Sequence, residues 1–270
     1  MNKGKVYIVG TPIGNLEDIT FRALKILKFV DFIACEDTRH SKILLDHYEI
    51  DKPTFSYHKF NEKGASEKII DLVLMGKNVA VISDAGMPAI SDPGFILIEK
   101  MIENNIDFEV IAGVSAVTCA IVGSGLDTSN FVFGGFLPDK KSERVECLKR
   151  LAGAECTIIL YSADHDLEKD LADCYAILGR RRVVVANDLT KKFEAFFRGY
   201  LGEIKLEKIK GEFVVLIEGQ VVGTALNDLE IEEHIEHYTK AGIDRKEALK
   251  LVAKDRGLSK SEVYAQSLKK

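Results

Sequence analysis

The amino-acid sequence predicts an α/β fold with two α/β domains, the N-terminal one built on a mostly parallel sheet and the C-terminal one on a mixed sheet, plus a small C-terminal helical extension. Short runs of β-branched and aromatic residues alternate with segments of helical period, which is typical of βαβ units. A helix of small residues at 115–125 separates two such sets, and the composition becomes strongly charged towards the C-terminus. We therefore expect domains at 1–116, 117–225 and 226–270, with a ligand cleft between the first two.

The first domain is expected to contain strands wherever a short apolar run ends at turn residues. These runs are Lys5–Val9, Phe29–Cys35, Thr54–His58, Val79–Ser83 and Phe108–Ile111. Between them, apolar residues recur at steps of three and four, which predicts helices. The helical segments are Asp18–Lys28, Thr38–Tyr48, Ser66–Met75 and Phe95–Asn104.

The second domain is expected to begin with the small-residue helix Ser115–Gly125. Its strands are predicted at Phe131–Gly135, Cys156–Tyr161, Arg182–Ala186 and Phe213–Glu218, with an edge strand or hairpin at Phe196–Ile204. Its further helices are predicted at Ser142–Leu151 and Asp166–Leu178. Strands and helices in this order favour a second compact α/β unit.

The C-terminal extension is expected to consist of an acidic segment at 228–236 followed by two short helices. Asp244 with Glu247, and Ser259 with Glu262, have the spacing of a capping box. In a capping box each of the two side chains accepts a hydrogen bond from the free backbone N–H of the other residue. Both pairs therefore predict where a helix begins.

The bulk composition is that of a soluble globular protein. Of the 270 residues, 46% are hydrophobic and 29% are charged, which excludes disordered and collagen-like classes. No apolar run reaches the roughly 18 residues of a membrane-spanning helix, so we expect a cytoplasmic protein with no membrane contact. The five cysteines lack C-x-x-C spacing and are expected to be buried thiols, not disulfides or nucleophiles.

Any contact with nucleic acid must come from a local basic patch, because the net charge of −5 gives no overall positive field. One candidate patch lies within 180–192. This segment contains a single acidic residue, Asp188, and five basic ones, Arg180, Arg181, Arg182, Lys191 and Lys192. A second candidate lies within 240–270. Either patch could instead be an ordinary solvated face.

Turns that follow the strands of a parallel sheet carry the functional residues of such domains. The turn Gly10-Thr11-Pro12-Ile13-Gly14-Asn15 follows the first strand and lacks both the dinucleotide G-x-G-x-x-G spacing and the Walker phosphate loop. Its two glycines still allow the backbone to approach a ligand closely, and its proline stiffens the turn. The pattern indicates either a ligand loop or a plain strand-to-helix turn.

The segment 83–94 contains two prolines, two glycines and two aspartates, and such loops are usually shaped for a function. Asp84 and Asp92 could be metal ligands or an acid/base pair, but no third ligand lies nearby in sequence. His234 and His237 have helical i, i+3 spacing, yet no carboxylate completes a known metal motif. We therefore expect no metal, and both histidines on the surface.

A third turn, 111–116, leads from a strand into the small-residue helix. It resembles the nucleophile elbow G-x-S-x-G, but Val117 replaces the second glycine, so Ser115 is not expected to be a hydrolase nucleophile. Backbone N–H groups at the start of that helix could instead hold a ligand carboxylate.

These turns form a long ordered set of motifs with further segments. The set comprises Val9–Leu16, Glu36–His40, Ser83–Gly94, Gly135–Pro138, Leu189–Lys191 with Glu194, Lys210–Glu212 and the C-terminal helices. It resembles the tetrapyrrole-methylase-like (class III) S-adenosylmethionine methyltransferases. Within that superfamily the chain is similar to the 16S ribosomal RNA cytidine ribose 2′-O-methyltransferases.

The resemblance implies a homodimer that binds S-adenosylmethionine in a cofactor cleft between the two domains and methylates 16S rRNA of the small ribosomal subunit. By position, it implies cofactor contacts at Thr11, Pro12, Asp84, Gly86, Met87, Ile90, Ser115, Ala116, Tyr161, Ala186, Asn187 and Glu218. The RNA-binding candidates are the basic residues at 180–182, Lys191 and Lys192. No metal is implied.

Methyl transfer from a sulfonium needs mainly the alignment of the attacking oxygen with the methyl carbon and the leaving sulfur. A base that removes the ribose 2′-hydroxyl proton would help further. The candidates for catalysis are Lys191, Glu194, Glu36, Asp37 and Arg39, which the sequence does not rank. A neutral Lys191 could act as the base, whereas a charged one would hold phosphate or the developing alkoxide.

The chain differs from the family pattern at four positions. Ala112 replaces a usual proline, Ser162 and Asp166 replace a glutamate and an arginine, and Asn187 replaces another arginine. Because two cationic side chains are missing, two alternatives stay open. One is a related methyltransferase acting on another RNA, a tetrapyrrole or a peptide, and the other is a catalytically weakened cofactor-binding homologue.

Overall fold

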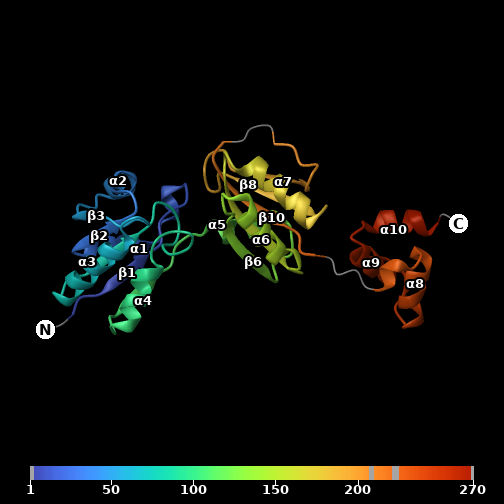
Figure 1. Ribbon diagram of the computed structural model, residues 1–270, viewed down its shortest axis with the longest axis horizontal. Helices are drawn as coiled ribbons and strands as arrows, with labels where there is room; N and C mark the ends of the chain where they lie inside the picture. Colours follow the sequence, from blue (N-terminus) through green and yellow to red (C-terminus); the bar gives the residue numbers. More distant parts are fainter. Residues whose placement is uncertain (1–2, 207–209, 221–224, 269–270) are drawn as a thin grey trace.

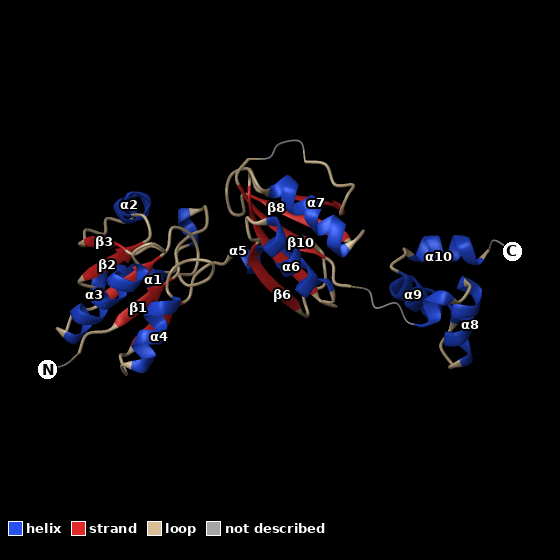
Figure 2. Ribbon diagram, viewed as in Figure 1, coloured by secondary structure: helices blue, strands red, loops and turns tan. Residues whose placement is uncertain are grey.

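The protein consists of two α/β units and a C-terminal group of helices, which follow one another along the chain (Figure 1). This computed structural model describes residues 3–206, 210–220 and 225–268. Figure 2 shows strands in the first two units and helices in the third. The predicted fold class is confirmed.

A five-stranded parallel sheet forms the centre of the N-terminal unit. Its strands are β1 (Val6–Val9), β2 (Phe32–Cys35), β3 (Thr54–Ser56), β4 (Val79–Ile82) and β5 (Phe108–Ile111), in the order β3-β2-β4-β1-β5. Every strand pair in this sheet is parallel. β1 and β4 are apolar and buried along their whole length, as expected for a sheet that is covered on both faces.

Helices cover the two faces of this sheet. The helices are α1 (Phe21–Phe29), α2 (Thr38–His47), α3 (Glu62–Leu74) and α4 (Phe95–Glu103). Leu27 of α1 and Leu45 of α2 share one core with Val9, whereas Val73 of α3 and Leu97 of α4 share another with Ile8. Successive residues of a strand point to opposite faces, so α1 and α2 lie on one face and α3 and α4 on the other.

Two helices of this unit begin elsewhere than the periodicity predicted. α1 begins at Phe21, not at Asp18, because the Thr20 hydroxyl caps it by accepting the Ala23 N–H at 3.0 Å. The preceding residues Leu16–Asp18 form a short 3₁₀ helix, η1. α3 begins at Glu62, earlier than Ser66, because its first turn is polar and does not show in the apolar pattern.

The second unit contains a five-stranded mixed sheet. Its strands are β6 (Phe131–Phe136), β7 (Thr157–Ala163), β8 (Arg182–Asn187), β9 (Ala195–Tyr200) and β10 (Glu212–Ile217), in the order β6-β7-β10-β8-β9. β6 and β7 are parallel, and the other pairs are antiparallel. The segment expected to form an edge strand or hairpin supplies β9, at the edge of the sheet.

Helices also cover both faces of the second sheet. The small-residue helix α5 (Ala116–Ser124) packs with Val184 and Leu216 on one face, and α6 (Lys141–Ala152) and α7 (Leu167–Leu178) pack on the other. Gly125, with φ of 76°, ends α5 in the left-handed conformation that glycine tolerates. All five cysteines are free thiols; Cys35 and Cys174 are buried and the others are partly exposed.

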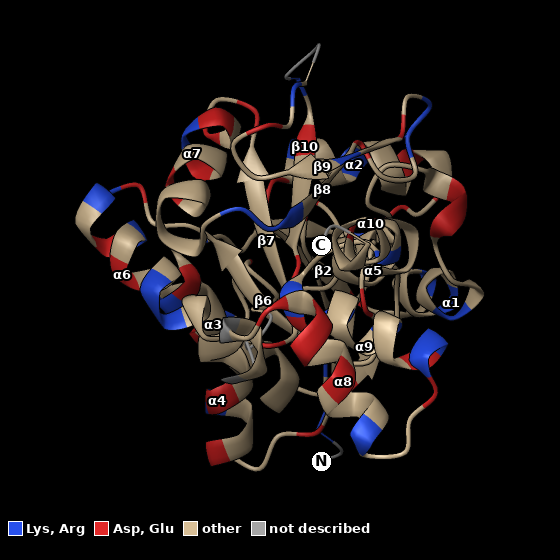
Figure 3. Ribbon diagram, turned by 90° about the vertical axis from the view of Figure 1, so that its right-hand side faces the viewer, with Lys and Arg blue, Asp and Glu red and all other residues tan. Residues whose placement is uncertain are grey.

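The C-terminal part contains the short 3₁₀ turn η2 (Ala225–Asp228) and three α-helices, α8 (Ile231–Lys240), α9 (Arg245–Arg256) and α10 (Lys260–Ser267). The acidic segment was expected to precede two helices, but it forms α8 itself (Figure 3). Asp244 caps α9, and Ser259 with Glu262 forms the predicted capping box at α10. Ile235, Val252 and Val263 belong to a separate core that the three helices share.

The prediction that His234 lies on the surface is wrong. Its side chain is fully buried and donates from Nε2 to Asp255 Oδ2 over 3.1 Å, while Nδ1 accepts a hydrogen bond from Arg256 Nε over 3.1 Å. Burial lowers the pKa of this imidazole. His234 therefore stabilises the helix packing in its neutral form, and His237, which is exposed as expected, lies apart from this network.

Candidate active site

The crevice of the first sheet lies at the carboxyl ends of β1 and β4. The chain leaves β1 through α1 on one face and leaves β4 through α4 on the other, although the two strands are neighbours. Such a switch point opens a crevice outside the strand ends, where ligands bind in open α/β sheets. The turns at 10–15 and 83–94 border this crevice.

Backbone contacts tie these turns together. Thr11 and Gly86 form an isolated bridge in which each N–H donates to the other carbonyl, at 2.8 and 3.1 Å. A Cβ on Gly10 would lie 2.6 Å from Met87 Sδ and 2.7 Å from Gly113 Cα, so any side chain there would push three loops apart. Close packing thus requires a glycine at position 10.

The 83–94 loop is held in a strained shape. Ala89 and Ser91 have φ of 69° and 64°, a left-handed conformation that costs non-glycine residues energy. The loop persists because Ala89 N donates to Pro93 O at 3.2 Å and Gly94 N donates to Glu62 Oε1 at 2.8 Å. Strain stored in this way is typical of functional loops.

A first cavity of about 470 Å³ lies between the two units. Its volume falls within the roughly 300–1,000 Å³ of small-molecule sites. The lining residues from the first unit are Ile13, Glu36, Asp84, Ala85, Gly86, Met87, Ile90, Ser91 and Asp92. Those from α5 and the second unit are Ser115, Ala116, Phe136, Tyr161, Ser162, Ala163, Asp164, His165, Leu189, Gly211, Glu212, Phe213 and Val214.

Three half-buried carboxylates give the first cavity a negative field. Burial raises the pKa of Asp92 to about 7, and the charges of Glu36 and Asp84 add to this effect. Burial and the charge of Asp84 also raise the pKa of Glu36. Asp84 is held in place by the backbone N–H of Asp37, which donates to its Oδ1 at 3.0 Å. The three carboxylates together favour a positively charged ligand.

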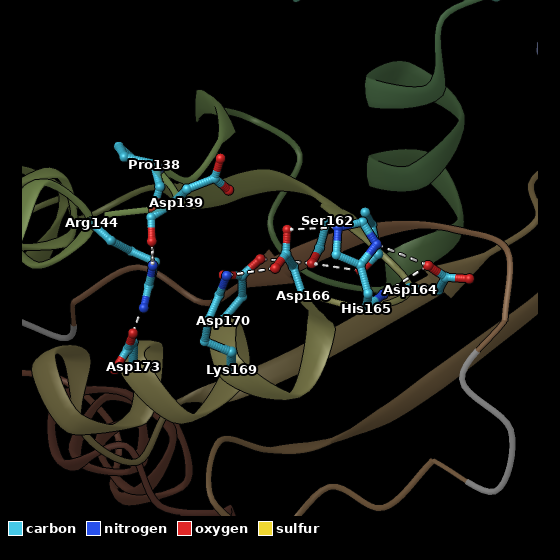
Figure 4. Close-up of polar contacts among 11 residues, drawn as sticks. Pro138, Asp139, Arg144, Ser162, Asp164, His165, Asp166, Lys169, Asp170 and Asp173 are labelled. Atoms are coloured by element: carbon cyan, nitrogen blue, oxygen red, sulfur yellow. Dashed lines mark hydrogen bonds and ion pairs between the residues drawn. The ribbon is translucent and has the colours of Figure 1, made fainter. Parts of the chain in front are cut away.

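The opposite wall of the first cavity is formed by the ends of β6 and β7. The rings of Phe136 and Tyr161 lie 5.3 Å apart and offer an aromatic surface. Ser162 donates to the buried Asp170 carboxylate at 2.7 Å (Figure 4). Asp166 pairs with Lys169 and, together with Asp164, flanks His165 (Figure 4). The departures at Ser162 and Asp166 are therefore accommodated within a local polar network.

A second cavity of about 360 Å³ adjoins the first and shares Ile13, Asp84, Ala85 and Glu212 with it. Its other lining residues are Thr11, Pro12, Gly14, Leu16, His40, Ser41, Ile43, Leu44, Ile82, Ser83 and Lys191. Lys191 Nζ donates to Asp188 Oδ1 at 2.9 Å and to Glu212 Oε2 at 2.8 Å. Although burial lowers the pKa of Lys191, these two partners outweigh burial and raise it. The two carboxylates thus favour the charged form of Lys191.

Two of the five catalytic candidates line the cavities. Glu36 lines the first cavity and Lys191 the second. Arg39 is exposed, and its hydrogen bonds hold the pKa of Asp37 far below its ordinary value. Glu194 accepts the Thr190 N–H at 2.7 Å and so stabilises its own loop.

Most of the predicted cofactor residues lie together. Those lining the first cavity are Asp84, Gly86, Met87, Ile90, Ser115, Ala116 and Tyr161, and those lining the second are Thr11 and Pro12. Ala186 and Asn187 are buried near the end of β8, outside both linings. Glu218 follows β10 at the end of the sheet away from the cavities, where it pairs with Arg182. The structure does not bring Glu218 to the site.

The predicted basic patch is split by strand β8. Arg180–Arg182 lie at the start of β8, whereas Lys191 and Lys192 follow it at the opposite end of the sheet. Arg181 donates to the backbone carbonyls of Leu178, Ala152 and Glu218, so its guanidinium is occupied within the fold. Lys191 and Lys192, by contrast, lie beside the cavities.

The sequence alone did not identify several of the lining residues as candidate ligand contacts. Phe136 belongs to the motif Gly135–Pro138, which was noted without a role, and Gly211 and Glu212 belong to another such motif. Asp92 was considered only together with Asp84. Among the described residues, no group of three or more His, Cys, Asp or Glu side chains is arranged to hold a metal ion.

Solved structures of methylases share this fold. The uroporphyrin-III-C-methyltransferase from Thermus thermophilus covers 80% of this chain and 94% of its own, with a TM-score of 0.59 at 19% identity. The methyltransferase CobJ covers 81% and 95%, with a TM-score of 0.63 at 16% identity. The fold is therefore that of the two-domain methylases.

Sequence comparison narrows the class of protein further. The model of the Tetrapyrrole (Corrin/Porphyrin) Methylases family matches residues 5–205. A protein of Halalkalibacterium halodurans named Ribosomal RNA small subunit methyltransferase I is 42% identical over 97% of this chain and 94% of its own. One with the same name from Mycoplasmopsis pulmonis is 53% identical over 78% and 96%. This chain belongs to the tetrapyrrole methylase family and is a methyltransferase.

A methyltransferase of this family uses a methyl donor of the S-adenosylmethionine type. Within the part of the chain that the structure describes, no helix has the length and apolar character needed to cross a bilayer.

Proposed function

We propose that this chain methylates ribosomal RNA of the small subunit with S-adenosylmethionine, and that the acceptor is the ribose 2′-oxygen of a cytidine in 16S ribosomal RNA. The observation that carries the proposal is the similarity to proteins named Ribosomal RNA small subunit methyltransferase I over nearly the whole chain. A tetrapyrrole substrate has less support, because the uroporphyrin-III-C-methyltransferase and CobJ structures are under 20% identical to this chain and support the fold alone.

The first cavity is suited to the methyl donor. The carboxylates of Glu36, Asp84 and Asp92 complement its sulfonium and amino charges, and the mutually tilted rings of Phe136 and Tyr161 offer aromatic surface for adenine. Backbone N–H groups at the start of α5, near Ser115, suit its carboxylate. When bound, the donor supplies a methyl group that is already activated by the sulfonium charge.

The second cavity is suited to the acceptor ribose. It meets the first cavity at Asp84 and Glu212, so an oxygen placed there lies next to the donor site. Lys191 is held as a cation by two carboxylates and would stabilise negative charge on the attacking oxygen or a phosphate. Of the three carboxylates among the catalytic candidates, Glu36 alone lines a cavity, and its pKa is raised, so we assign it to accept the hydroxyl proton.

The proposal extends to assembly and location. We propose a homodimer in the cytoplasm, where small subunits are made; exposed aromatic residues such as Phe60 and Phe95 on the N-terminal unit provide apolar surface for a partner. We retain the domain division at 1–116, 117–225 and 226–270. It is supported by α5, whose core residues pack with the second sheet, and by the separate core of α8–α10.

The test is a methylation assay on defined substrate. Purified protein and labelled S-adenosylmethionine are incubated with small subunits from a strain that lacks the enzyme, and ribose methylation is mapped along the RNA. Label on one cytidine is expected. Label on a base, on another RNA or on protein would contradict the proposal. S-adenosylhomocysteine binding without any transfer would indicate a cofactor-binding homologue instead.

A further inference from the structure

The loop between β8 and β9, residues 188–194, presents an aromatic ring to solvent beside a cation. The Phe193 side chain is 77% exposed, which places most of a phenyl ring in water without any core to shield it. Lys192 Nζ lies 5.6 Å from the centre of this ring. An exposed aromatic ring next to a cation matches the two chemical features of an unpaired nucleotide, a flat base and a phosphate.

The backbone of this loop is rigidly held. Asp188 and Thr190 adopt left-handed φ of 47° and 66°. Thr190 N donates to Glu194 Oε2 at 2.7 Å, Lys191 N donates to Asp188 O at 3.0 Å, and Glu194 N donates to Lys191 O at 3.1 Å. These bonds fix the loop before any ligand arrives, so a partner of Phe193 would not have to order it.

The loop also lies at the mouth of the second cavity, which we propose for the acceptor ribose. Asn15 N, from the first unit, donates to Thr190 Oγ1 at 3.0 Å, so the loop spans the junction of the two units. A shallow groove of about 540 Å³ runs along it, lined by Gly14, Asn15, Leu16, Glu17, His47, Thr190, Lys191 and Lys192. Gly14, Leu16 and Lys191 line both this groove and the second cavity. A chain entering the cavity would therefore pass along the loop.

We propose that Phe193 is a stacking platform for an unpaired base of the substrate RNA next to the methylated nucleotide, with Lys192 holding the adjoining phosphate. This inference rests on the proposed RNA substrate and adds a residue that selects single-stranded RNA at the site. Sequence-specific RNA binding commonly stacks splayed bases on aromatic side chains. The cation of Lys192 favours RNA over a second copy of the chain as the occupant, since RNA supplies the matching negative charge.

The chain contains no tryptophan, which makes the test direct. A Phe193→Trp variant carries a single tryptophan at the proposed contact, and base stacking should quench its fluorescence as a single-stranded RNA oligonucleotide of small-subunit sequence is added. Met75→Trp is the matched control, because Met75 is 75% exposed at the end of α3, away from the cavities. There Gly4 N, just before β1, donates to Val73 O at 2.9 Å. Saturable, salt-sensitive quenching is expected in the Phe193→Trp variant and not in the control.

Kinetics give the second measurement. Phe193→Ala should raise the KM for small subunits about tenfold to a hundredfold, the usual loss for one stacked base, and should leave donor affinity unchanged. Phe193→Trp should restore the KM. An unchanged KM in Phe193→Ala, or fluorescence of the Phe193→Trp variant that responds to protein concentration but not to RNA, would overturn the assignment. If the wild-type chain methylates no small subunit, the proposed function is wrong. RNA binding at position 193 can still be measured in that case, from the fluorescence quenching of the Phe193→Trp variant.

Discussion

Replacing Asp92 by asparagine should stabilise the free protein while weakening the methyl-donor site. Burial and two neighbouring carboxylates raise the pKa of Asp92 from 3.8 to about 7. Each pKa unit corresponds to about 1.4 kcal/mol, so the ionised side chain would cost at most about 4 kcal/mol at pH 8. Because Asp92 is half-buried and water reaches it, we expect about half of that, roughly 2 kcal/mol.

The pH dependence of stability gives the sign of the Asp92→Asn effect. The folded state keeps the Asp92 proton to a higher pH than the unfolded chain does, so wild-type stability falls as the pH rises from about 4 to about 7. An asparagine at this position cannot ionise and is spared this loss. The variant should therefore gain about 2 kcal/mol over the wild type at pH 8, a melting-temperature rise of roughly 4–8 °C, and nothing near pH 4.

Chemical and thermal denaturation at both pH values would measure this gain. Asp46→Asn, at an exposed carboxylate on α2, is the control and should change stability by less than about 0.5 kcal/mol. Calorimetry with the donor should show weaker binding to the Asp92→Asn variant, because one negative charge is lost from the cavity. A variant that is less stable than the wild type at pH 8, or equally stabilised at pH 4, would refute the reasoning.

Four further predictions concern other parts of the molecule. Gly14→Ala should raise the KM for small subunits, because its Cβ would lie 2.6 Å from Lys191 Cγ and 2.9 Å from Thr190 Oγ1; an unaltered KM would contradict this. Glu36→Gln should lower kcat about a hundredfold or more at pH 7, and a matching loss of donor affinity in calorimetry would instead assign it to binding. A chain ending at residue 225 should bind the donor normally, since none of the residues that the structure describes beyond 214 lines the first cavity; loss of donor binding in calorimetry would contradict this. At a pH below about 6.5, the ordinary pKa of histidine, helices α8–α10 should lose stability, because the unfolded chain binds a proton on His234 more readily than the folded chain does. Circular-dichroism melts at pH 5 and 7.5 should show this loss of stability, and the loss should be smaller in the His234→Gln variant.

Local sequence patterns were sufficient to predict the strands, the helices and the turns of the first unit. β1 and β4 are continuous apolar runs, and the turns after them contain glycine and proline, so the crevice could be located from topology alone. The pattern failed where the first turn of a helix is polar, as at Glu62. It also failed for His234, because the residues that bury it, Asp255 and Arg256, come from another helix.

The site was harder to predict because it depends on direction along a strand. Arg182 and Lys191 are close in sequence, yet β8 carries them to opposite ends of the sheet. Glu218 is displaced for the same reason, since β10 begins at the cavity and ends away from it. The raised pKa of Asp92 arises in part from Glu36, a residue of another loop, and no local motif encodes such an encounter.

The central place of β1 in the first sheet has a consequence during synthesis. β1 leaves the ribosome before the other strands of its sheet, but within the described residues its partners are β4 and β5, so Val6 waits for both Val79 and Phe108. Pairings that are so distant in sequence form slowly, and apolar strands that wait for partners are prone to aggregate. Nascent chains that stop before residue 108 thus expose an unpaired apolar strand, and chaperones that bind such strands should recognise them.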